Sequence, residues 1–262
     1  MKAGIIGFGQ IGRGVTQRIR DGEAGATELR AILVRDRAKS MGAGADDLIT
    51  DDADAFLGAD LDVIVEVGGH PALRQYAERV LEAGKDLLTV SVGAFADGDF
   101  LERVTETARR TGRRVLVPSG AIAGLDMISA AALAPIDSAT HTTHKNPRAF
   151  TPEQLGGRVV EDEPVLLFEG PARQGVGLFP ENVNVAAAVS LAGIGLDRTT
   201  LRVYADPNIE RNMHEVEVNG YFGRVRIEVE NIPSSNPKTG RIVELSIAKA
   251  LRNLSAPFVI GL

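Results

Sequence analysis

Two features of this sequence have residue types and spacing that suit ligand binding or catalysis. The first is the glycine pattern G-x-G-x-x-G at residues 7–12, in which a backbone turn can approach a pyrophosphate. The second is His214, one of only four histidines, which follows the polar stretch DPNIERN and precedes an alternating run. An imidazole suits acid–base catalysis because its ordinary pKa is near neutrality, but the same histidine could simply begin a strand.

The glycine pattern follows a short apolar strand and opens a helix, which is the context that gives it force. The first glycine permits a tight turn, the second lets the backbone approach a pyrophosphate, and the third allows close helix–strand packing. The N–H groups at the helix N-terminus can then bind phosphate. We therefore expect a cofactor-binding turn made by Gly7, Gly9, Gln10, Ile11 and Gly12.

The end of the second strand should meet the adenosine ribose of the cofactor. An acid there favours NAD through the 2′-hydroxyl, whereas an arginine accommodates the 2′-phosphate of NADP. The sequence offers both, Arg35 followed by Asp36, so it predicts NAD or NADP without choosing between them. Asp36 could also serve only as the N-cap of a short helix.

The elements that position the glycine turn alternate between strand and helix. Apolar runs predict strands at 2–6, 28–36, 62–67, 86–91 and 113–118, and amphipathic runs predict helices at 71–85 and 97–112. Strands and helices that alternate at this spacing indicate βαβ units and a parallel sheet. The first half is therefore predicted to be a Rossmann-type α/β domain.

The pattern changes after about residue 120. We expect a helix over 124–136, a strand over 138–145, a small-residue helix over 182–195 and an antiparallel hairpin around Asn219-Gly220. A final amphipathic helix, 238–254, should pack back on the first domain. The prediction is a dinucleotide-binding domain of residues 1–120, completed by 236–262, and a smaller α+β domain of residues 121–235.

Composition narrows the function classes. The chain of 262 residues has a formal net charge of −6, which gives no reason to expect a nucleic-acid partner. It contains no cysteine, which excludes disulfides, thiolate metal sites and cysteine nucleophiles, and we expect no metal. No apolar run is long enough to span a membrane, and nothing at the N-terminus resembles a signal peptide. We expect a cytoplasmic protein without a membrane partner.

Several segments of the sequence, in order, resemble the L-aspartate dehydrogenase family. The resemblance is most specific in NVNVAAA (182–188) and NMH (212–214), and it extends to SVGAFAD (91–97), PSGAIAGLD (118–126) and NPKTG (236–240). It implies reversible, NAD- or NADP-dependent oxidation of L-aspartate to iminoaspartate, which hydrolyses to oxaloacetate and ammonia. It leaves open whether iminoaspartate feeds NAD biosynthesis. It also implies a homodimer, in which the second domain, residues 121–235, is the substrate and dimerisation domain.

The same resemblance assigns residues. His214 matches the family's active-site histidine, and Ala121 and Asn184 match positions that contact the cofactor. We also expect substrate contacts from Asn212 and from His70, which follows the third strand.

The substrate has two carboxylates, which need cations or oriented N–H donors. Lys145 is the first candidate for a cation, with a catalytic role as well, although it could be a solvated lysine, and Arg148 is the second candidate. His141 and His144 are three apart on a strand and should point to opposite faces. We assign no role to either.

Other readings of the sequence stay open. A dihydrodipicolinate reductase would share the glycine turn and a histidine-rich strand before a lysine, but it would also have a double histidine, which this chain lacks. A homoserine dehydrogenase would lack the NVNVAAA helix. A non-catalytic dinucleotide sensor would bind cofactor without turning over substrate.

Overall fold

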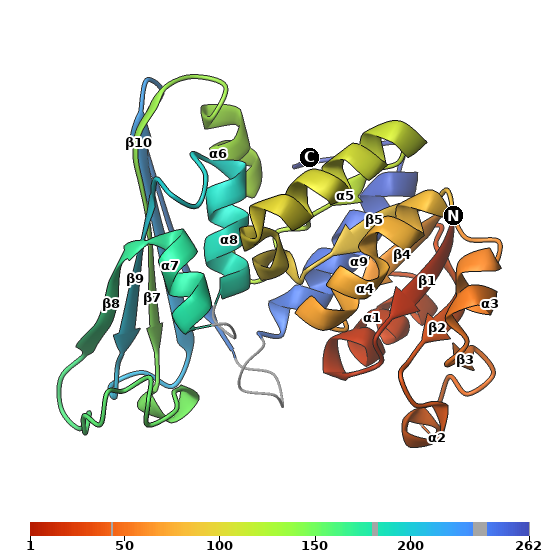
Figure 1. Cartoon of the computed structure of the whole chain (residues 1–262), viewed down its shortest axis with the longest axis horizontal. Helices are drawn as coiled ribbons and strands as arrows, with labels where there is room; N and C mark the ends of the chain where they lie inside the picture. The colour runs from red at the N-terminus through yellow and green to blue at the C-terminus, as the bar shows by residue number, and fades with distance from the viewer. Residues whose placement is uncertain (43, 180–182, 233–239, 262) are drawn as a thin grey trace. The chain divides into compact units, whose positions relative to one another are not determined.

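The computed structural model describes residues 1–42, 44–179, 183–232 and 240–261. The chain divides into two compact units, one of Met1–Pro118 with Val243–Leu262 and one of Ser119–Ile242 (Figure 1). The boundary expected at residues 235–236 falls within 233–239, which lie outside the described residues.

The first unit is built on a six-stranded sheet of order β3-β2-β1-β4-β5-β6, in which every neighbouring pair is parallel. This order is the one found in dinucleotide-binding folds, so the predicted Rossmann-type sheet is confirmed. The strands are β1 (Lys2–Ile6), β2 (Glu28–Leu33), β3 (Ile49–Thr50), β4 (Val63–Glu66), β5 (Asp86–Thr89) and β6 (Val115–Leu116).

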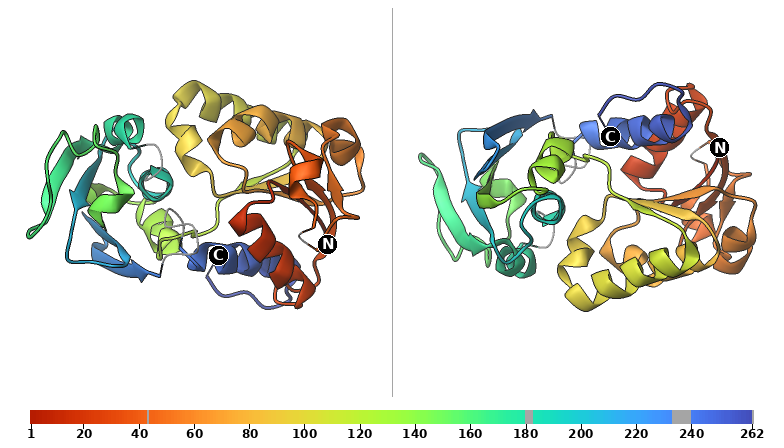
Figure 2. Two further views of the ribbon diagram at one scale, coloured as in Figure 1. Left: turned by 90° about the horizontal axis from the view of Figure 1, so that it is seen from below. Right: turned by 90° about the horizontal axis from the view of Figure 1, so that it is seen from above.

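Helices cover both faces of this sheet. Figure 2 shows α1 and α9 on one face and α4 and α5 on the other. Because both faces are covered, β4 and β5 are buried at every residue, which explains the continuous apolar run VIV. The helices are α1 (Gln10–Arg20), α2 (Arg37–Ser40), α3 (Ala53–Gly58), α4 (His70–Glu82), α5 (Gly98–Thr111) and α9 (Ile242–Ser255), with a 3₁₀ helix η1 (Val92–Ala96).

The C-terminal helix α9 packs on α1, although the two are more than 200 residues apart. The guanidinium of Arg18 lies 3.1 Å from a carboxylate oxygen of Glu244. Gly14 makes the close approach possible, since a Cβ at this position would meet that same carboxylate at 1.8 Å. Contact with α1 therefore fixes α9 within the first unit.

The turn between β1 and α1 can form only with glycine at two positions. Gly7 has a φ of +97°, and a Cβ on it would lie 2.7 Å from the Cα of Gly68. A Cβ on Gly12 would lie 2.3 Å from the carbonyl oxygen of Gly7. The first turn of α1 is therefore packed directly against the loop that precedes it.

The second unit has a five-stranded mixed sheet of order β11-β10-β7-β9-β8. Only the β7–β9 pair is parallel. The helices α6, α7 and α8 cover one face of this sheet (Figures 1 and 2). The elements are α6 (Leu125–Ala131), β7 (Ile136–Lys145), η2 (Pro147–Ala149), β8 (Val165–Pro171), α7 (Ala172–Leu178), α8 (Val183–Ala192), β9 (Thr199–Ala205), β10 (Asn212–Gly220) and β11 (Gly223–Asn231).

Alternating burial makes the covered face of this sheet the core of the second unit. Inward residues of β7 and β10 pack against α6 and α8 in one apolar cluster. The buried members are Ile122, Ile128, Ala131, Ile136, Ala139, Val185, Val189, Val216 and Val218. This confirms the predicted α+β character of the second unit.

Two expected boundaries in this unit are wrong. The helix expected over 124–136 ends at Ala131, and Ile136 already begins β7, because Pro135 has no N–H with which to continue a helix. The hairpin is confirmed, but its turn lies at Tyr221–Phe222, between the paired Gly220 and Gly223. Asn219, expected in the turn, lies within the strand opposite Arg224.

Several elements were not expected from the sequence, namely β3 and α3 in the first unit and β8, α7 and β9 in the second, whereas α2 is the short helix that Asp36 was considered to cap. Across the described ranges, no helix has the length and apolar character needed to cross a membrane.

Gly9 and Gly12, at the start of α1, should respond differently to substitution by alanine. Gly12→Ala forces a Cβ against a backbone oxygen, so we expect it to lower the free energy of unfolding by about 1–3 kcal/mol, the usual cost of overpacking. Gly9→Ala is the matched control, because nothing lies within 4 Å of its Cβ position. Urea denaturation compares the two, and equal stability of both variants would contradict the close packing at Gly12.

Candidate active site

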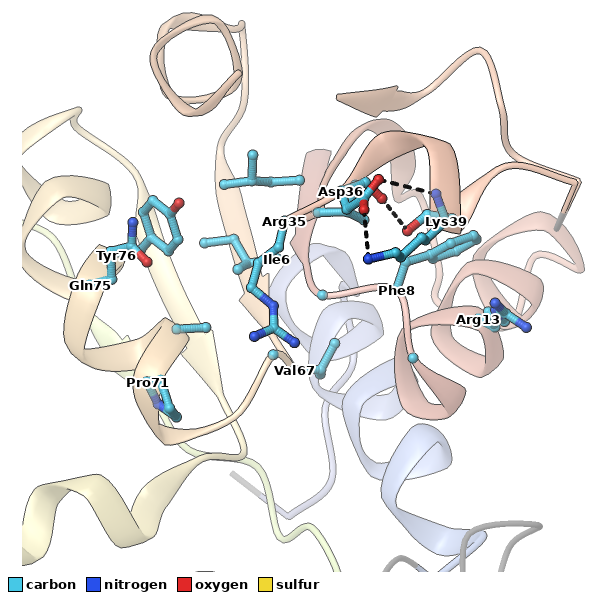
Figure 3. Close-up of a pocket in the computed structure, with 17 residues that line it drawn as sticks. Ile6, Phe8, Arg13, Arg35, Asp36, Lys39, Val67, Pro71, Gln75 and Tyr76 are labelled. Carbon is cyan, nitrogen blue, oxygen red and sulfur yellow. Dashed lines mark hydrogen bonds and ion pairs between the residues drawn. The ribbon is translucent and has the colours of Figure 1, made fainter. Parts of the chain in front are cut away.

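A pocket of about 610 Å³ lies at the carboxyl ends of β1, β2 and β4 in the first unit (Figure 3). In an open parallel sheet this edge is where ligands bind, at the point where the strand order reverses. Four of the predicted cofactor residues line it: Gly7, Gly9, Arg35 and Asp36. The other lining residues are Ile6, Phe8, Arg13, Leu33, Val34, Lys39, Ser40, Val67, Gly68, Pro71, Ala72, Gln75 and Tyr76.

The glycine turn fits a dinucleotide. A side chain at Gly9 would enter open space, so glycine is not required there for packing within the chain, and a ligand can approach the bare backbone. No side chain caps α1 at Gly9, and the first N–H groups of a helix have no partner within the helix. Gln10, Ile11 and Gly12 do not line the pocket, and they form this first turn of α1. The turn can therefore donate backbone hydrogen bonds to a pyrophosphate.

The ribose end of the pocket carries both signs of charge. Arg35 is exposed, and its side chain extends between the wall of Gln75 and Tyr76 and the wall of Phe8 and Lys39 (Figure 3). Asp36 accepts a hydrogen bond from the backbone N–H of Lys39 at 3.3 Å, as the N-cap of α2, and its carboxylate lies 3.0 Å from the Lys39 ammonium. Asp36 is thus both an N-cap and a pocket residue.

A buried carboxylate that sequence reasoning missed holds the loop that follows β4, which forms another wall of the pocket. Glu66, the last residue of β4, is fully buried. One of its oxygens accepts hydrogen bonds from the N–H groups of Gly68 (2.7 Å) and Gly69 (2.9 Å), and the other accepts from the Thr89 hydroxyl (2.6 Å). Burial raises the pKa of Glu66, and these hydrogen bonds counteract the rise. Glu66 therefore fixes the loop at Gly68 that lines the pocket.

His70, which was expected to contact substrate, begins α4 directly after this loop and does not line the pocket.

Protonatable side chains gather in the second unit at the end of the covered face of its sheet. Along β7, alternate residues His141, Thr143 and Lys145 are buried, and His214 in β10 lies opposite Thr143. The exposed fractions of His141, Lys145 and His214 are 0%, 5% and 4%. The predicted catalytic residues His214 and Lys145 thus lie in one buried cluster, together with His141, to which the sequence assigned no role.

The two imidazoles in this cluster are in direct contact. Nε2 of His141 lies 3.3 Å from Nδ1 of His214, and the rings stack with centroids 5.4 Å apart. Burial lowers the pKa of His141 to about 3, with a smaller contribution from the Lys145 charge. Burial, followed by the charges of His141 and Lys145, also holds the pKa of His214 well below its usual value. Both rings are therefore neutral at pH 7, although the ordinary pKa of an imidazole is near neutrality.

His144 points to the opposite face of β7, as its spacing from His141 predicted. Its ring stacks on Tyr204 with centroids 4.6 Å apart, and its Nδ1 lies 3.1 Å from the carboxylate of Asp206. The N–H of Asp206 donates to the carbonyl of Lys145 at 2.8 Å. These contacts tie the DPNIERN segment, which joins β9 to β10, to the end of β7. The segment thereby fixes where β10 begins and which face His214 occupies.

The other predicted site residues of the second unit come from β10, α8 and the segment before α6. Asn212 is the first residue of β10 and lies opposite Asn231. The carbonyl of Ala121 accepts a hydrogen bond from the Asn231 amide at 2.8 Å. Asn184 is exposed in the first turn of α8. Their contacts with cofactor or substrate stay predictions.

Two family descriptions match this chain, one in each half. Residues 7–118 match the description "Homoserine dehydrogenase, NAD binding domain", which agrees with the pocket of the first unit. Residues 126–254 match "Aspartate dehydrogenase, C-terminal", a range that contains His141, Lys145 and His214.

Curated relatives extend the similarity to the full length. An L-aspartate dehydrogenase of Archaeoglobus fulgidus is 42% identical over 262 residues, covering 99% of this chain and 100% of the relative. One of Methanosarcina barkeri is 39% identical over 281 residues, covering 100% and 99%. The crystal structure of an aspartate dehydrogenase from Thermotoga maritima superposes with a TM-score of 0.81 at 27% identity and covers 100% of this chain and 99% of its own.

A homoserine dehydrogenase from Thiobacillus denitrificans, with a TM-score of 0.64 and 14% identity over 100% of this chain and 76% of its own, shares the fold alone. Identity near 40% over both units, with His214 and Lys145 inside the matched range, is a much more specific likeness. The chain belongs to the aspartate dehydrogenase family.

Proposed function

We propose that this protein is an NAD- or NADP-dependent dehydrogenase of L-aspartate. The observation that carries the proposal is the full-length similarity, at 39–42% identity, to two relatives named L-aspartate dehydrogenase. The overall reaction converts L-aspartate, NAD(P)⁺ and water into oxaloacetate, ammonium, NAD(P)H and a proton. Oxidation gives iminoaspartate first, and water then hydrolyses it. The reaction is reversible, so reductive amination of oxaloacetate is the same chemistry in the other direction.

The first unit would hold the cofactor. Gly7 and Gly9 line the path for the pyrophosphate, and Arg35 and Asp36 lie where the adenosine ribose would bind. When bound, the cofactor supplies the acceptor for the hydride that leaves the α-carbon of aspartate. We also expect Ala121 and Asn184 to contact the cofactor.

The second unit would handle protons and carboxylates. In the oxidative direction a base must take a proton from the substrate amine and later from the attacking water. His214 is neutral at pH 7, so its free ring nitrogen can accept a proton without first losing one. A lowered pKa makes it a weaker base, and it returns the proton readily. Lys145 supplies positive charge in the same buried cluster, which suits a substrate carboxylate, and Asn212 is a further candidate contact.

The proposal also includes two expectations that came from the sequence and its resemblance to the family, namely a cytoplasmic location and a homodimer. Analytical ultracentrifugation of the purified protein tests the second.

A substrate screen tests the proposed function. We expect absorbance at 340 nm to rise when the protein is mixed with L-aspartate and NAD or NADP, and to fall when NAD(P)H is mixed with oxaloacetate and ammonium. Homoserine is the matched control, because it has the same carbon backbone with an alcohol in place of the second carboxylate. Turnover of homoserine but not aspartate would contradict the proposal, and cofactor binding without turnover of either would indicate a sensor.

Arg35 should affect the choice of cofactor. Arg35→Ala is expected to weaken NADP binding more than NAD binding, by about 1–3 kcal/mol for a lost charge-assisted hydrogen bond to the 2′-phosphate. Fluorescence titration with both reduced cofactors measures the difference. Arg37→Ala is the control, since Arg37 is a nearby exposed arginine outside the set of pocket residues. Equal losses for both cofactors would show that Arg35 does not contact the 2′ position.

His214 should affect turnover and not cofactor binding. We expect His214→Ala to lower kcat by about 10²–10⁴, the usual contribution of general acid–base catalysis, with the Kd for cofactor near that of the parent. Thr142→Ala is the control, because Thr142 lies on the opposite face of β7 from His141 and pairs with Glu215. Steady-state kinetics with thermal unfolding as a check on folding measures both. A near-normal kcat for a folded His214→Ala protein would remove His214 from the mechanism.

A further inference from the structure

His141 makes one polar contact and leaves one ring nitrogen with none. Its Nε2 lies 3.3 Å from Nδ1 of His214, whereas its Nδ1, fully buried, has no hydrogen-bond partner within the parts of the chain that the structure describes. Buried polar atoms are nearly always paired, so an exception calls for a physical reason. The mechanism proposed above makes no use of this residue.

Contact with His141 gives the two ring nitrogens of His214 different surroundings. Nδ1 is occupied by the neighbouring ring, so Nε2 is the nitrogen available to a substrate. A neutral imidazole carries one hydrogen, on one nitrogen or the other. If that hydrogen were on Nε2, His214 could only donate to the substrate and could not act as the base. A base therefore requires the hydrogen on Nδ1, where it points to His141.

We propose that His141 is a positioning residue that accepts the Nδ1–H of His214 and so holds Nε2 of His214 as a free lone pair. This inference rests on the proposed role of His214 as the base. A neutral His141 that accepts at Nε2 must then carry its own hydrogen on the unpartnered Nδ1. The unpartnered Nδ1–H of His141 then accompanies the tautomer in which His214 can act as the base.

The same contact strengthens during the reaction. When His214 takes a proton at Nε2 it becomes an imidazolium, and its Nδ1–H then donates as a charged group to His141. The charged group that opposes this state from β7 is Lys145, whereas the residues opposite His214 in the two neighbouring strands, Thr143 of β7 and Val229 of β11, are uncharged. Nε2 of His141 is the acceptor that lies against Nδ1 of His214, so it can stabilise the transient charge.

Two substitutions of His141 distinguish the effect of losing the hydrogen-bond acceptor from the effect of changing the side-chain volume. His141→Phe keeps an aromatic ring and removes the acceptor, and it should lower kcat roughly 10- to 100-fold, the loss expected for a hydrogen bond to a charged group. His141→Gln keeps an acceptor oxygen and should recover most of that loss. The KM for aspartate, the Kd for cofactor by fluorescence, and the unfolding midpoint should stay near the parent values in both variants.

The outcomes distinguish this inference from the proposed function. A folded His141→Phe protein with parental kcat overturns the positioning role, and so do Phe and Gln variants that are equally impaired. If the Phe variant does not fold, the Gln variant decides alone, since a kcat more than about tenfold below the parent would contradict an acceptor role. The His141→Phe change should cost nothing further in a His214→Ala background. Normal turnover by His214→Ala itself would instead overturn the proposed role of His214.

Discussion

The chemistry of the second unit depends on a contact between two imidazoles that burial keeps neutral. His141 and His214 come from strands β7 and β10, which pair in register, so their meeting follows directly from the sheet. Desolvation is the largest cause of the low pKa of both rings, and the nearby Lys145 charge acts in the same direction. Neutral rings have one N–H each, and the position of that hydrogen decides whether His214 accepts or donates a proton.

The first unit depends on a different feature, a glycine turn whose backbone is accessible to a ligand. Its glycine turn is held from two sides: Gly12 packs against the carbonyl of Gly7, and Gly7 packs against Gly68. Glu66 then holds the Gly68 loop through two backbone N–H groups. Gly9 is the only glycine of the motif that faces open space, so this is where a ligand can approach the backbone.

What the sequence could predict was set by local patterns. The glycine motif and the alternation of strands and helices act over a few residues, and they led to the correct sheet and a correct hairpin with a misplaced turn. Four of the residues expected to bind cofactor, Gly7, Gly9, Arg35 and Asp36, line the pocket. His214 was identified through its resemblance to a family, because its own surroundings did not separate a catalytic histidine from the start of a strand.

The residues that sequence reasoning missed depend on contacts between distant segments. The partner of His141 is 73 residues away, and the partner of Glu66 at Thr89 is 23 residues away. Neither pairing leaves a local pattern, although an acid at the end of a buried apolar strand is a signal that could have pointed to Glu66. The short elements β3 and α3 were missed for a related reason, since runs of two and six residues are too short to show a period.

The most direct measurement is ¹⁵N NMR of the histidine rings at neutral pH. The chain has only four histidines, so single substitutions can assign every ring. If the account is correct, His141 and His214 are both neutral, and His214 carries its hydrogen on Nδ1 with a free lone pair on Nε2. A His214 ring that is charged at neutral pH, or that carries its hydrogen on Nε2, would contradict it.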